Sequence, residues 1–254
     1  MTVEDLRAYY SKILPVYQTE SAANAHLAFW RGLARRWRPG RILEIGSGLG
    51  RIAGALSRHA PAIGIDISIE MLALASNRRA SGTRARFVAA DMRELAFGCP
   101  FDLIIAPSDP FSHWTAIRDR RRALRSIAAR LSPKGHFVLE GLYRRGRRIE
   151  IPERRVRHSG GGLGIGETWT RTGRDLWRAE YRYRDRAADG RERIIHAEFE
   201  ARAWNAAEIR SFFASCGLTI ETLWRDFDRR PFRADADRLI AVARRRARFV
   251  QARA

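Results

Sequence analysis

The 254-residue sequence has few cysteines, few lysines and no long apolar run. Its two cysteines, Cys99 and Cys216, cannot form a disulfide framework, and their spacing suits no metal site. No apolar stretch approaches the roughly 20 residues that a membrane-spanning helix needs. The acidic start at residues 1–5 lacks the basic and apolar regions of a signal peptide. We therefore expect a reduced, cytoplasmic protein with no metal site and no membrane partner.

Acidic residues are also scarce relative to basic ones, and the net charge is +20. Such a charge ordinarily indicates a nucleic-acid partner. Lys12 and Lys134 are the only lysines, however, so 46 of the 48 basic residues are arginine. This bias suggests GC-rich codon usage rather than selection for phosphate contacts, and the arginines are dispersed along the chain. Nucleic acid therefore stays open only as an alternative partner.

A glycine-rich turn follows the first apolar strand of the sequence. The run Ile42-Leu43-Glu44-Ile45-Gly46-Ser47-Gly48-Leu49-Gly50 leads into a helical pattern at 51–59. Glycine allows a tight turn and a close approach of ligand to backbone, and the free N–H groups of the helix would face that ligand. Asp66 ends the next apolar strand, twenty positions after Gly46, where a carboxylate can accept both hydroxyl protons of a ribose. The pattern predicts a nucleotide-type pocket.

The glycine spacing separates two kinds of nucleotide pocket. A dinucleotide fold has the pattern G-x-G-x-x-G, which would place its third glycine at Arg51. Here the third glycine is Gly50, which gives E-x-G-x-G-x-G. This spacing argues against a nicotinamide-dependent oxidoreductase, which we keep as an alternative, together with a catalytically inert scaffold that binds a cofactor.

Residues 41–110 resemble the cofactor half of class I S-adenosylmethionine-dependent methyltransferases. The further matching stretches are Ile65-Asp66-Ile67-Ser68 with Glu70-Met71-Leu72, Phe87-Val88-Ala89-Ala90-Asp91-Met92-Arg93-Glu94-Leu95, Phe101-Asp102-Leu103-Ile104-Ile105-Ala106-Pro107 and Leu131-Ser132-Pro133-Lys134-Gly135-His136-Phe137-Val138-Leu139. The resemblance continues through 208–218 to 239–242 and is weakest before residue 35 and between 145 and 195. It implies S-adenosylmethionine as cofactor, S-adenosylhomocysteine as product and methyl transfer to a nitrogen or oxygen of a small molecule. An RNA- or protein-modifying methyltransferase is the alternative.

The resemblance also implies roles for cofactor residues. Glu44 would lie near the cofactor's amino group, Asp66 would bind the ribose hydroxyls, and Asp91 would accept from the adenine amino group. Glu44 bound to backbone, Met71 in the core and Asp91 as a helix N-cap are the structural alternatives. The other residues expected at the cofactor are Tyr17, Gly46, Ser47, Gly48, Gly50, Ile67, Met71, Met92, Arg93, Ala106 and Pro107.

The segment after the fourth strand, residues 106–114, would face the transferred methyl group. Asp109-Pro110-Phe111 does not match the Asn/Asp-Pro-Pro-Tyr/Phe tetrad of amino-methylating DNA enzymes, whereas Phe111-Ser112-His113-Trp114 approaches the small-molecule branch. His113 is the candidate base or acceptor-orienting group, because an unperturbed imidazole titrates near neutrality; a capping or core histidine is the alternative. The other expected acceptor-binding residues are Tyr9, Tyr10, Ser108, Asp109, Trp114 and Trp169. The two tyrosines could instead anchor the lid, and Trp169 could belong to the platform core or a subunit contact.

Hydrophobic periodicity predicts a doubly wound, Rossmann-like α/β fold. Helices are expected at 3–14 and 20–37 with a break at Pro15, then at 50–59, 69–79, 115–131 and 205–216. Strands at 41–45, 62–66, 84–89, 102–106, 135–140, 218–226 and 236–244 would form a seven-stranded sheet with the last strand antiparallel. Residues 144–165 show no helical period, and 166–203 alternate like a three-stranded antiparallel meander. The resulting organisation is an N-terminal helical lid at 1–38, a cofactor-binding core at 39–143, a β-meander insertion at 144–203 that serves as substrate platform or homodimer contact, the rest of the core at 204–246, and a frayed tail at 247–254.

Overall fold

The computed structural model describes residues 1–22, 26–77, 83–158, 161–187, 189–236 and 238–246. The predicted tail at 247–254 lies outside these residues. No helix in the described ranges is long and apolar enough to cross a membrane.

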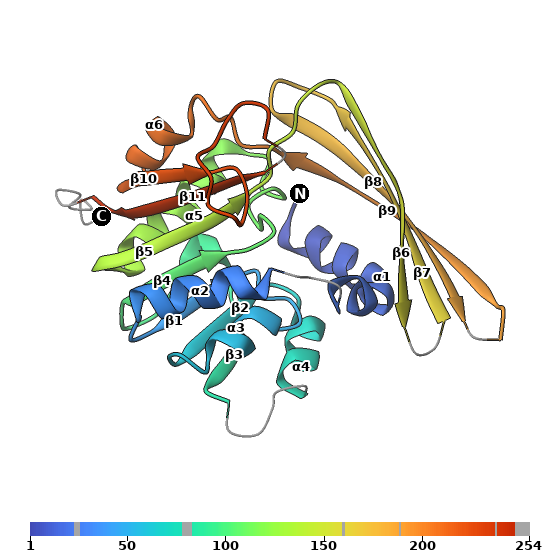
Figure 1. The fold of residues 1–254 in the computed structure, drawn as a ribbon, viewed down its shortest axis with the longest axis horizontal. Helices are drawn as coiled ribbons and strands as arrows, with labels where there is room; N and C mark the ends of the chain where they lie inside the picture. Colours follow the sequence, from blue (N-terminus) through green and yellow to red (C-terminus); the bar gives the residue numbers. More distant parts are fainter. Residues whose placement is uncertain (23–25, 78–82, 159–160, 188, 237, 247–254) are drawn as a thin grey trace.

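A seven-stranded sheet forms the centre of the molecule, in the order β10-β11-β5-β4-β1-β2-β3 (Figure 1). β1 pairs in parallel with β2 and β4, while β11 is antiparallel to both β5 and β10. The predicted fold class, with its antiparallel C-terminal strand, is therefore confirmed. The strands are β1 Ile42–Ile45, β2 Ala62–Asp66, β3 Ala85–Ala89, β4 Phe101–Ala106, β5 Leu131–Gly141, β10 Leu218–Trp224 and β11 Leu239–Arg245.

Helices cover both faces of this sheet, which explains why β1 is buried along its whole length, including Glu44. One apolar cluster joins α2 and α3 to the sheet through residues such as Trp30, Leu33 and Leu56, and another joins α5 and α6 through Ile127 and Phe213. The helical segments of the core are α2 Leu27–Trp37, α3 Arg51–Leu56, α4 Ile69–Asn77, the 3₁₀ segment η1 Met92–Glu94, α5 Ile117–Arg130 and α6 Ile209–Ala214.

The strand order places a switch point between β1 and β4, because the chain runs from β1 toward β3 on one side and from β4 toward β5 on the other. In open α/β sheets, ligands bind outside the carboxyl ends of the strands at this point. The glycine turn after β1 and the segment after β4 both lie there.

The first helix, α1 Val3–Ala22, runs through Pro15, so the predicted break at this proline is wrong. A proline inside a helix removes one backbone hydrogen bond and clashes with the preceding turn. Burial of Ile13 and Val16 against Leu163 and Tyr183 of the neighbouring sheet offsets that cost. Tertiary packing therefore overrides the local signal.

The inserted antiparallel sheet has four strands, β6 Arg148–His158, β7 Gly161–Arg171, β8 Leu176–Ala187 and β9 Glu192–Arg202, rather than the three predicted. β6 and the first half of β7 fall in the segment predicted to be irregular. The β6–β7 register shifts between Ile151 and Arg154, around Pro152. A bulge of this kind changes which side chains face the core and so conceals the alternation of a strand.

α1 lies between the central sheet and the four-stranded sheet (Figure 1). Its apolar side contributes Ile13 and Val16 to the cluster that packs on β7 and β8, while Leu6 joins the cluster of the central sheet. The helix thus forms part of the wall between the strand ends of the core and the inserted sheet.

Candidate functional site

The turn after β1 has a left-handed backbone at all three glycines, with φ angles of 66° at Gly46, 48° at Gly48 and 71° at Gly50. L-residues with side chains rarely adopt this conformation. A Cβ atom on Gly46 would also lie 2.8 Å from Cβ of Pro110, and one on Gly50 would overlap the ring of Phe87. The backbone conformation therefore favours glycine at all three positions, and the lack of space adds to this at Gly46 and Gly50.

Asp66 ends β2 and fastens the turn. Its Oδ2 accepts from the Gly48 amide at 2.8 Å, and its Oδ1 accepts from the Ser68 amide at 2.9 Å. Burial raises the pKa of this carboxyl group, while the bonds from Ser68 and Gly48 lower it. A carboxylate oxygen can accept more than one hydrogen bond, so Asp66 retains the capacity to bind hydroxyl groups.

Glu44 lies in the middle of the buried sheet, with only 2% of its surface exposed. Its Oε2 accepts a hydrogen bond from the Ala53 amide of α3 at 2.7 Å, which is the backbone contact given above as the alternative role of Glu44. Burial raises the pKa of Glu44 to about 8, although the Ala53 amide opposes the shift. Glu44 also lines a cavity of about 60 Å³ together with Tyr17, Gly46, Ser47 and Pro107.

A second small cavity, of about 50 Å³, lies on the other side of Gly46. It contains several residues predicted for the adenosine moiety: Asp66, Ile67, Asp91, Met92 and also Trp114, which was predicted on the acceptor side. The two small cavities are not lined by Gly48, Gly50, Met71, Arg93 or Ala106. Met71 and Ala106 are buried in the core, and Gly48 and Gly50 shape the turn.

Asp91 caps η1 by accepting from the Arg93 amide at 2.8 Å, and it forms an ion pair with the Arg93 guanidinium at 2.7 Å. The same guanidinium bonds Asp119 at 3.0 Å and lies over the ring of Trp114 at 3.8 Å. Arg93 therefore positions two walls of this second small cavity, Asp91 and Trp114, and does not itself line the cavity.

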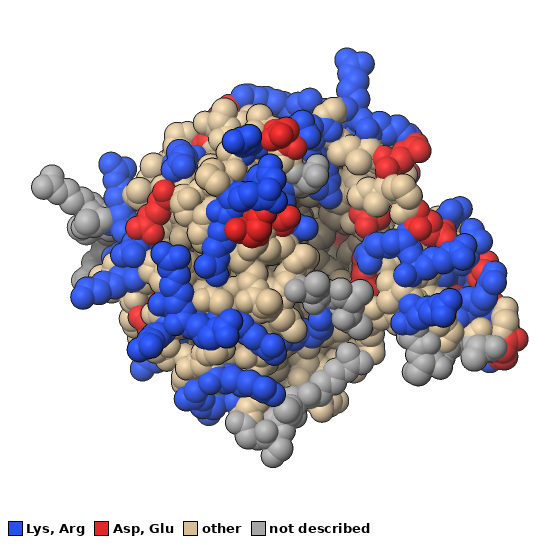
Figure 2. Space-filling view, in the orientation of Figure 1, with Lys and Arg blue, Asp and Glu red and all other residues tan. Residues whose placement is uncertain are grey.

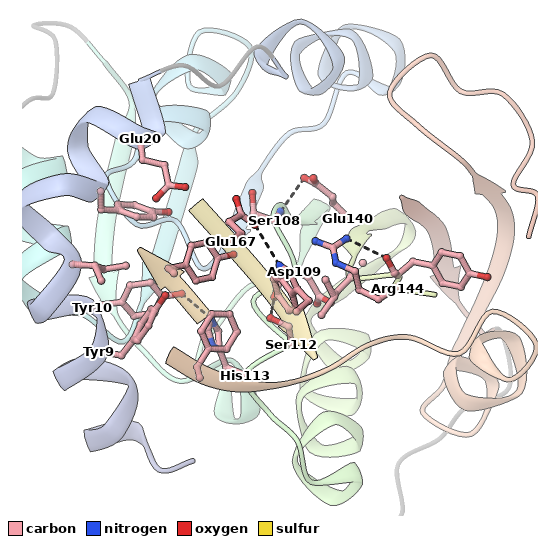
Figure 3. Close-up of a pocket in the computed structure, with 18 of the residues that line it drawn as sticks. Tyr9, Tyr10, Glu20, Ser108, Asp109, Ser112, His113, Glu140, Arg144 and Glu167 are labelled. Carbon is pink, nitrogen blue, oxygen red and sulfur yellow. Dashed lines mark hydrogen bonds between the residues drawn. The ribbon is translucent and has the colours of Figure 1, made fainter. Parts of the chain in front are cut away.

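A larger cavity of about 420 Å³ lies between α1, the segment after β4 and the four-stranded sheet (Figure 3). The predicted residues Tyr9, Tyr10, Ser108, Asp109, His113 and Trp169 all line it, as does Tyr17. Tyr181 and Tyr183, which the sequence offered either for an acceptor pocket or for the platform core, line it too. Sequence reasoning missed the other walls, which include Glu20, Glu140, Arg144, Arg154, Glu167, Phe199 and Arg238. The period-two alternation of 166–184 places Glu167, Trp169, Tyr181 and Tyr183 on one face of the sheet, which was the available signal.

His113 and Tyr10 join two cavities, because both residues line the large cavity and the second small cavity. The Tyr10 hydroxyl lies 2.8 Å from Nε2 of His113, while Nδ1 has no hydrogen-bond partner among the described residues. Burial lowers the pKa of His113 to about 4. Burial therefore keeps His113 neutral at pH 7, and its role as a base or acceptor-orienting group stays a prediction.

The segment after β4 is fastened to both ends of the inserted sheet. Ser108 and Asp109 have left-handed φ angles of 55° and 44°. Asp109 accepts from the Leu142 amide at 2.6 Å, on the entry side of the sheet. Where the chain leaves the inserted sheet at the end of β9, the Arg202 amide donates to the Ser112 carbonyl oxygen at 2.8 Å. Buried Arg120 donates to the carbonyl oxygens of residues 111, 202 and 203. The position of His113 is thereby linked to that of the four-stranded sheet.

Basic side chains are scattered over the visible face, on the core as well as on the inserted sheet (Figure 2). The large cavity differs, since its walls carry four carboxylates and three guanidinium groups. Within the described residues, no group of three histidine, cysteine or acidic side chains could hold a metal ion.

This geometry agrees with comparisons to known proteins. Residues 42–135, which contain the glycine turn, Asp66, Asp91 and the segment after β4, match a family model described as a methyltransferase domain. The segment is therefore a methyltransferase domain, and the chain has the fold of class I S-adenosylmethionine-dependent methyltransferases, as its motifs predicted.

Individual relatives cover different shares of the chain. This chain is 32% identical over 103 residues to the putative methyltransferase YqeM of Bacillus subtilis (strain 168). The match spans 40% of this chain and 42% of YqeM. An S-adenosylmethionine-dependent methyltransferase from Clostridium acetobutylicum ATCC 824 has a TM-score of 0.76 at 17% identity, covering 94% of this chain and 99% of its own. CalS10, an amino pentose methyltransferase from Micromonospora echinaspora, has a TM-score of 0.74 at 23% identity, with coverages of 91% and 95%.

Proposed function

We propose that the protein is an S-adenosylmethionine-dependent methyltransferase that transfers a methyl group to a nitrogen or oxygen of a small molecule. One observation carries the proposal: two small cavities meet at Gly46 of the glycine turn, and each shares wall residues with the large cavity. Gly46 lines both small cavities, Tyr10 and His113 link one of them to the large cavity, and Tyr17 and Ser108 link the other. This arrangement suits a two-part cofactor whose centre faces an acceptor.

The chain's residues fit each part of such a cofactor. Asp66, at the end of β2, would accept the ribose hydroxyls, and Asp91 would accept from the adenine amino group beside Ile67 and Met92. Glu44 and the turn at Gly46 would hold the amino-acid part. When bound, the cofactor supplies a methyl group on a positively charged sulfur.

The protein contributes positioning rather than a covalent intermediate. In-line displacement needs the acceptor's lone pair held on the axis of the breaking bond with water excluded, and such positioning supplies roughly 7–11 kcal/mol. Tyr10 and His113 lie where the acceptor would meet the methyl group. Because burial lowers its pKa to about 4, His113 orients the acceptor through a hydrogen bond instead of storing its proton.

The size of the acceptor follows from the large cavity. A volume of about 420 Å³ lies within the range of about 300–1,000 Å³ that is typical of small-molecule sites. The relative CalS10 acts on an amino pentose, which supports an acceptor of this size. We also propose a cytoplasmic location, which the two free thiols of Cys99 and Cys216 support.

Asp66 gives the direct test. We expect Asp66→Ala to weaken S-adenosylhomocysteine binding by at least about 100-fold, because buried hydroxyl–carboxylate bonds are lost. Calorimetry measures the affinity. Asp102→Ala is the matched control, since Asp102 also accepts from two backbone amides, those of Gly40 and Arg41, at the opposite end of the sheet. Equal affinity in wild type and Asp66→Ala, or equal losses in both variants, would contradict the assignment.

The net charge of +20 favours a second candidate, a methyltransferase that modifies RNA or protein. A methyltransferase that modifies RNA would transfer methyl groups to RNA, and its affinity for RNA would fall steeply as the salt concentration rises. Transfer to small acceptors at constant rate across that salt range supports the first candidate instead.

A further inference from the structure

We propose that the methyl acceptor carries a positively charged amine, bound in the large cavity by the carboxylates of Glu20 and Glu167 and the surrounding aromatic rings. The inference rests on the proposed function and adds the chemical class of the substrate. Figure 3 shows Glu20 reaching the cavity from α1 and Glu167 reaching it from the four-stranded sheet.

The charge of the cavity is opposite to that of the molecule. The whole chain carries 48 basic and 28 acidic residues. The cavity walls instead carry Asp109, Glu20, Glu140 and Glu167 against Arg144, Arg154 and Arg238. An excess of carboxylates in this cavity favours a cationic ligand, because the carboxylates attract positive groups and repel anionic ligands.

Two of the four carboxylates hold the protein's own backbone. Asp109 accepts from the amides of Leu142 and Phe111, and Glu140 accepts from the Ser108 amide at 2.9 Å while it pairs with Arg238. These bonds fix the segment after β4. The carboxylates left to recognise a ligand are therefore those of Glu20 and Glu167.

Glu20 and Glu167 share one guanidinium group. Arg154 forms an ion pair with Glu20, and its Nε lies 3.9 Å from Glu167. Tyr183 donates to Glu20 at 3.2 Å, and Trp169 donates to Glu167 at 3.3 Å. Among the ion pairs of the described residues, these two mostly buried carboxylates share the one cation of Arg154. A bound ammonium group would add a second positive charge and offset the cost of burying both carboxylates.

The aromatic walls also favour a cation. Trp169 packs against Tyr181 and Phe199, with ring centroids 6.3 and 5.9 Å apart. The Arg144 guanidinium lies 4.7 Å from the centre of the Trp169 ring, so this wall already stabilises a positive group. Ring faces attract cations through their quadrupole, and this attraction adds to that of the two carboxylates.

Three probes of one shape and different charge test the proposal: benzylammonium, benzyl alcohol and benzoate. Their dissociation constants are measured by ligand-observed NMR on the full chain saturated with S-adenosylhomocysteine. We expect benzylammonium to bind at least about 10-fold more tightly than benzyl alcohol, which corresponds to about 1.4 kcal/mol, and benzoate to bind most weakly.

The variants Glu20→Gln and Glu167→Gln keep the hydrogen-bond acceptors of Tyr183 and Trp169 but remove charge. Each should lower the preference for benzylammonium over benzyl alcohol, and the double variant should reduce it to about twofold or less. Glu198→Gln, on the exposed surface of β9, is the matched control and should keep the full preference.

Equal binding of the three probes, tighter binding of benzoate, or no saturable binding of benzylammonium would overturn the inference. So would a full preference in the double variant. Tighter binding of benzoate would show that Arg144 and Arg154 select an anionic acceptor. Loss of the proposed function has a separate signature, because the chain would then fail to bind S-adenosylhomocysteine by calorimetry whatever its preference among the probes.

Discussion

Glu44 is a carboxylate that is buried beside the place proposed for the cofactor's amino group. Burial raises the pKa of Glu44 to about 8, so most molecules carry a proton on this carboxyl group at pH 7 before a ligand binds. A positive amino group nearby favours the ionised form. We therefore expect S-adenosylhomocysteine binding at pH 7 to release up to one proton from Glu44, and the affinity to rise as the pH increases toward 8.

Calorimetry in phosphate and Tris buffers measures this release, since their heats of ionisation differ. Glu44→Gln removes the titrating group and should abolish the difference between the buffers. A wild-type protein without a buffer-dependent heat would contradict the assignment of Glu44.

His113 predicts how stability depends on pH. Its pKa is about 4 in the folded protein and near 6.5 in an unfolded chain, so the unfolded state binds more protons below pH 6.5. The stabilisation is complete above that pH and is lost as the pH falls toward 4. We expect His113 to account for about 2 kcal/mol of the fall in unfolding free energy between pH 7.5 and 5.

Urea unfolding at both pH values tests this expectation. His113→Gln should lose about 2 kcal/mol less between pH 7.5 and 5 than wild type does, whereas His59→Gln, at an exposed position, should behave like wild type. An equal loss in wild type and His113→Gln would show that the imidazole is not held neutral by burial.

At the scale of elements, α1 is the helix with the clearest conflict between local and tertiary preferences. Pro15 is exposed, and its ring removes a hydrogen bond from the helix interior. We expect Pro15→Ala to increase the unfolding free energy by about 1–3 kcal/mol. Chemical denaturation measures the change. Lys12→Ala, at another exposed site of α1, is the control and should change stability by less than about 0.5 kcal/mol; a similar gain in both variants would contradict the explanation.

The helices and strands differ in how well the sequence predicts their position. The strands of the central sheet were predicted within a few residues because each is a short apolar run between clear turn signals. β6 was not predicted, because Pro152 and the register shift after Ile151 interrupt its alternation. The helix break at Pro15 was predicted wrongly because Ile13 and Val16 gain a partner, the inserted sheet, that sequence periodicity does not reveal.

The candidate site shows the same division. Asp66 and the glycine turn were found from spacing, since both come from adjacent strand ends of one βαβ unit. Glu20 and Glu167 were not found, because their proximity depends on how α1 packs on β7. The pKa of His113 also could not be read from the sequence, since burial in the tertiary structure lowers it.

At the scale of the whole molecule, a net charge of +20 implies self-repulsion in the compact state. We expect the midpoint of thermal unfolding to rise by several degrees as sodium chloride is increased from about 20 to about 300 mM. Salt screens the repulsion between positive charges that lie more than about 10 Å apart. Calorimetry measures the midpoint, and sucrose at matched osmolality is the control. A midpoint that is independent of salt would show that local ion pairs already compensate the charge.

The sequence by itself determined the cofactor half: the strand, the glycine turn and the carboxylate of Asp66 are close in the chain, so local geometry brings them together. Only the tertiary structure decided the large cavity, the neutral state of His113 and the pairing of Glu20 with Glu167 across Arg154. These features depend on contacts between distant segments and on burial, which arise when α1 and the four-stranded sheet pack against the strand ends of the core.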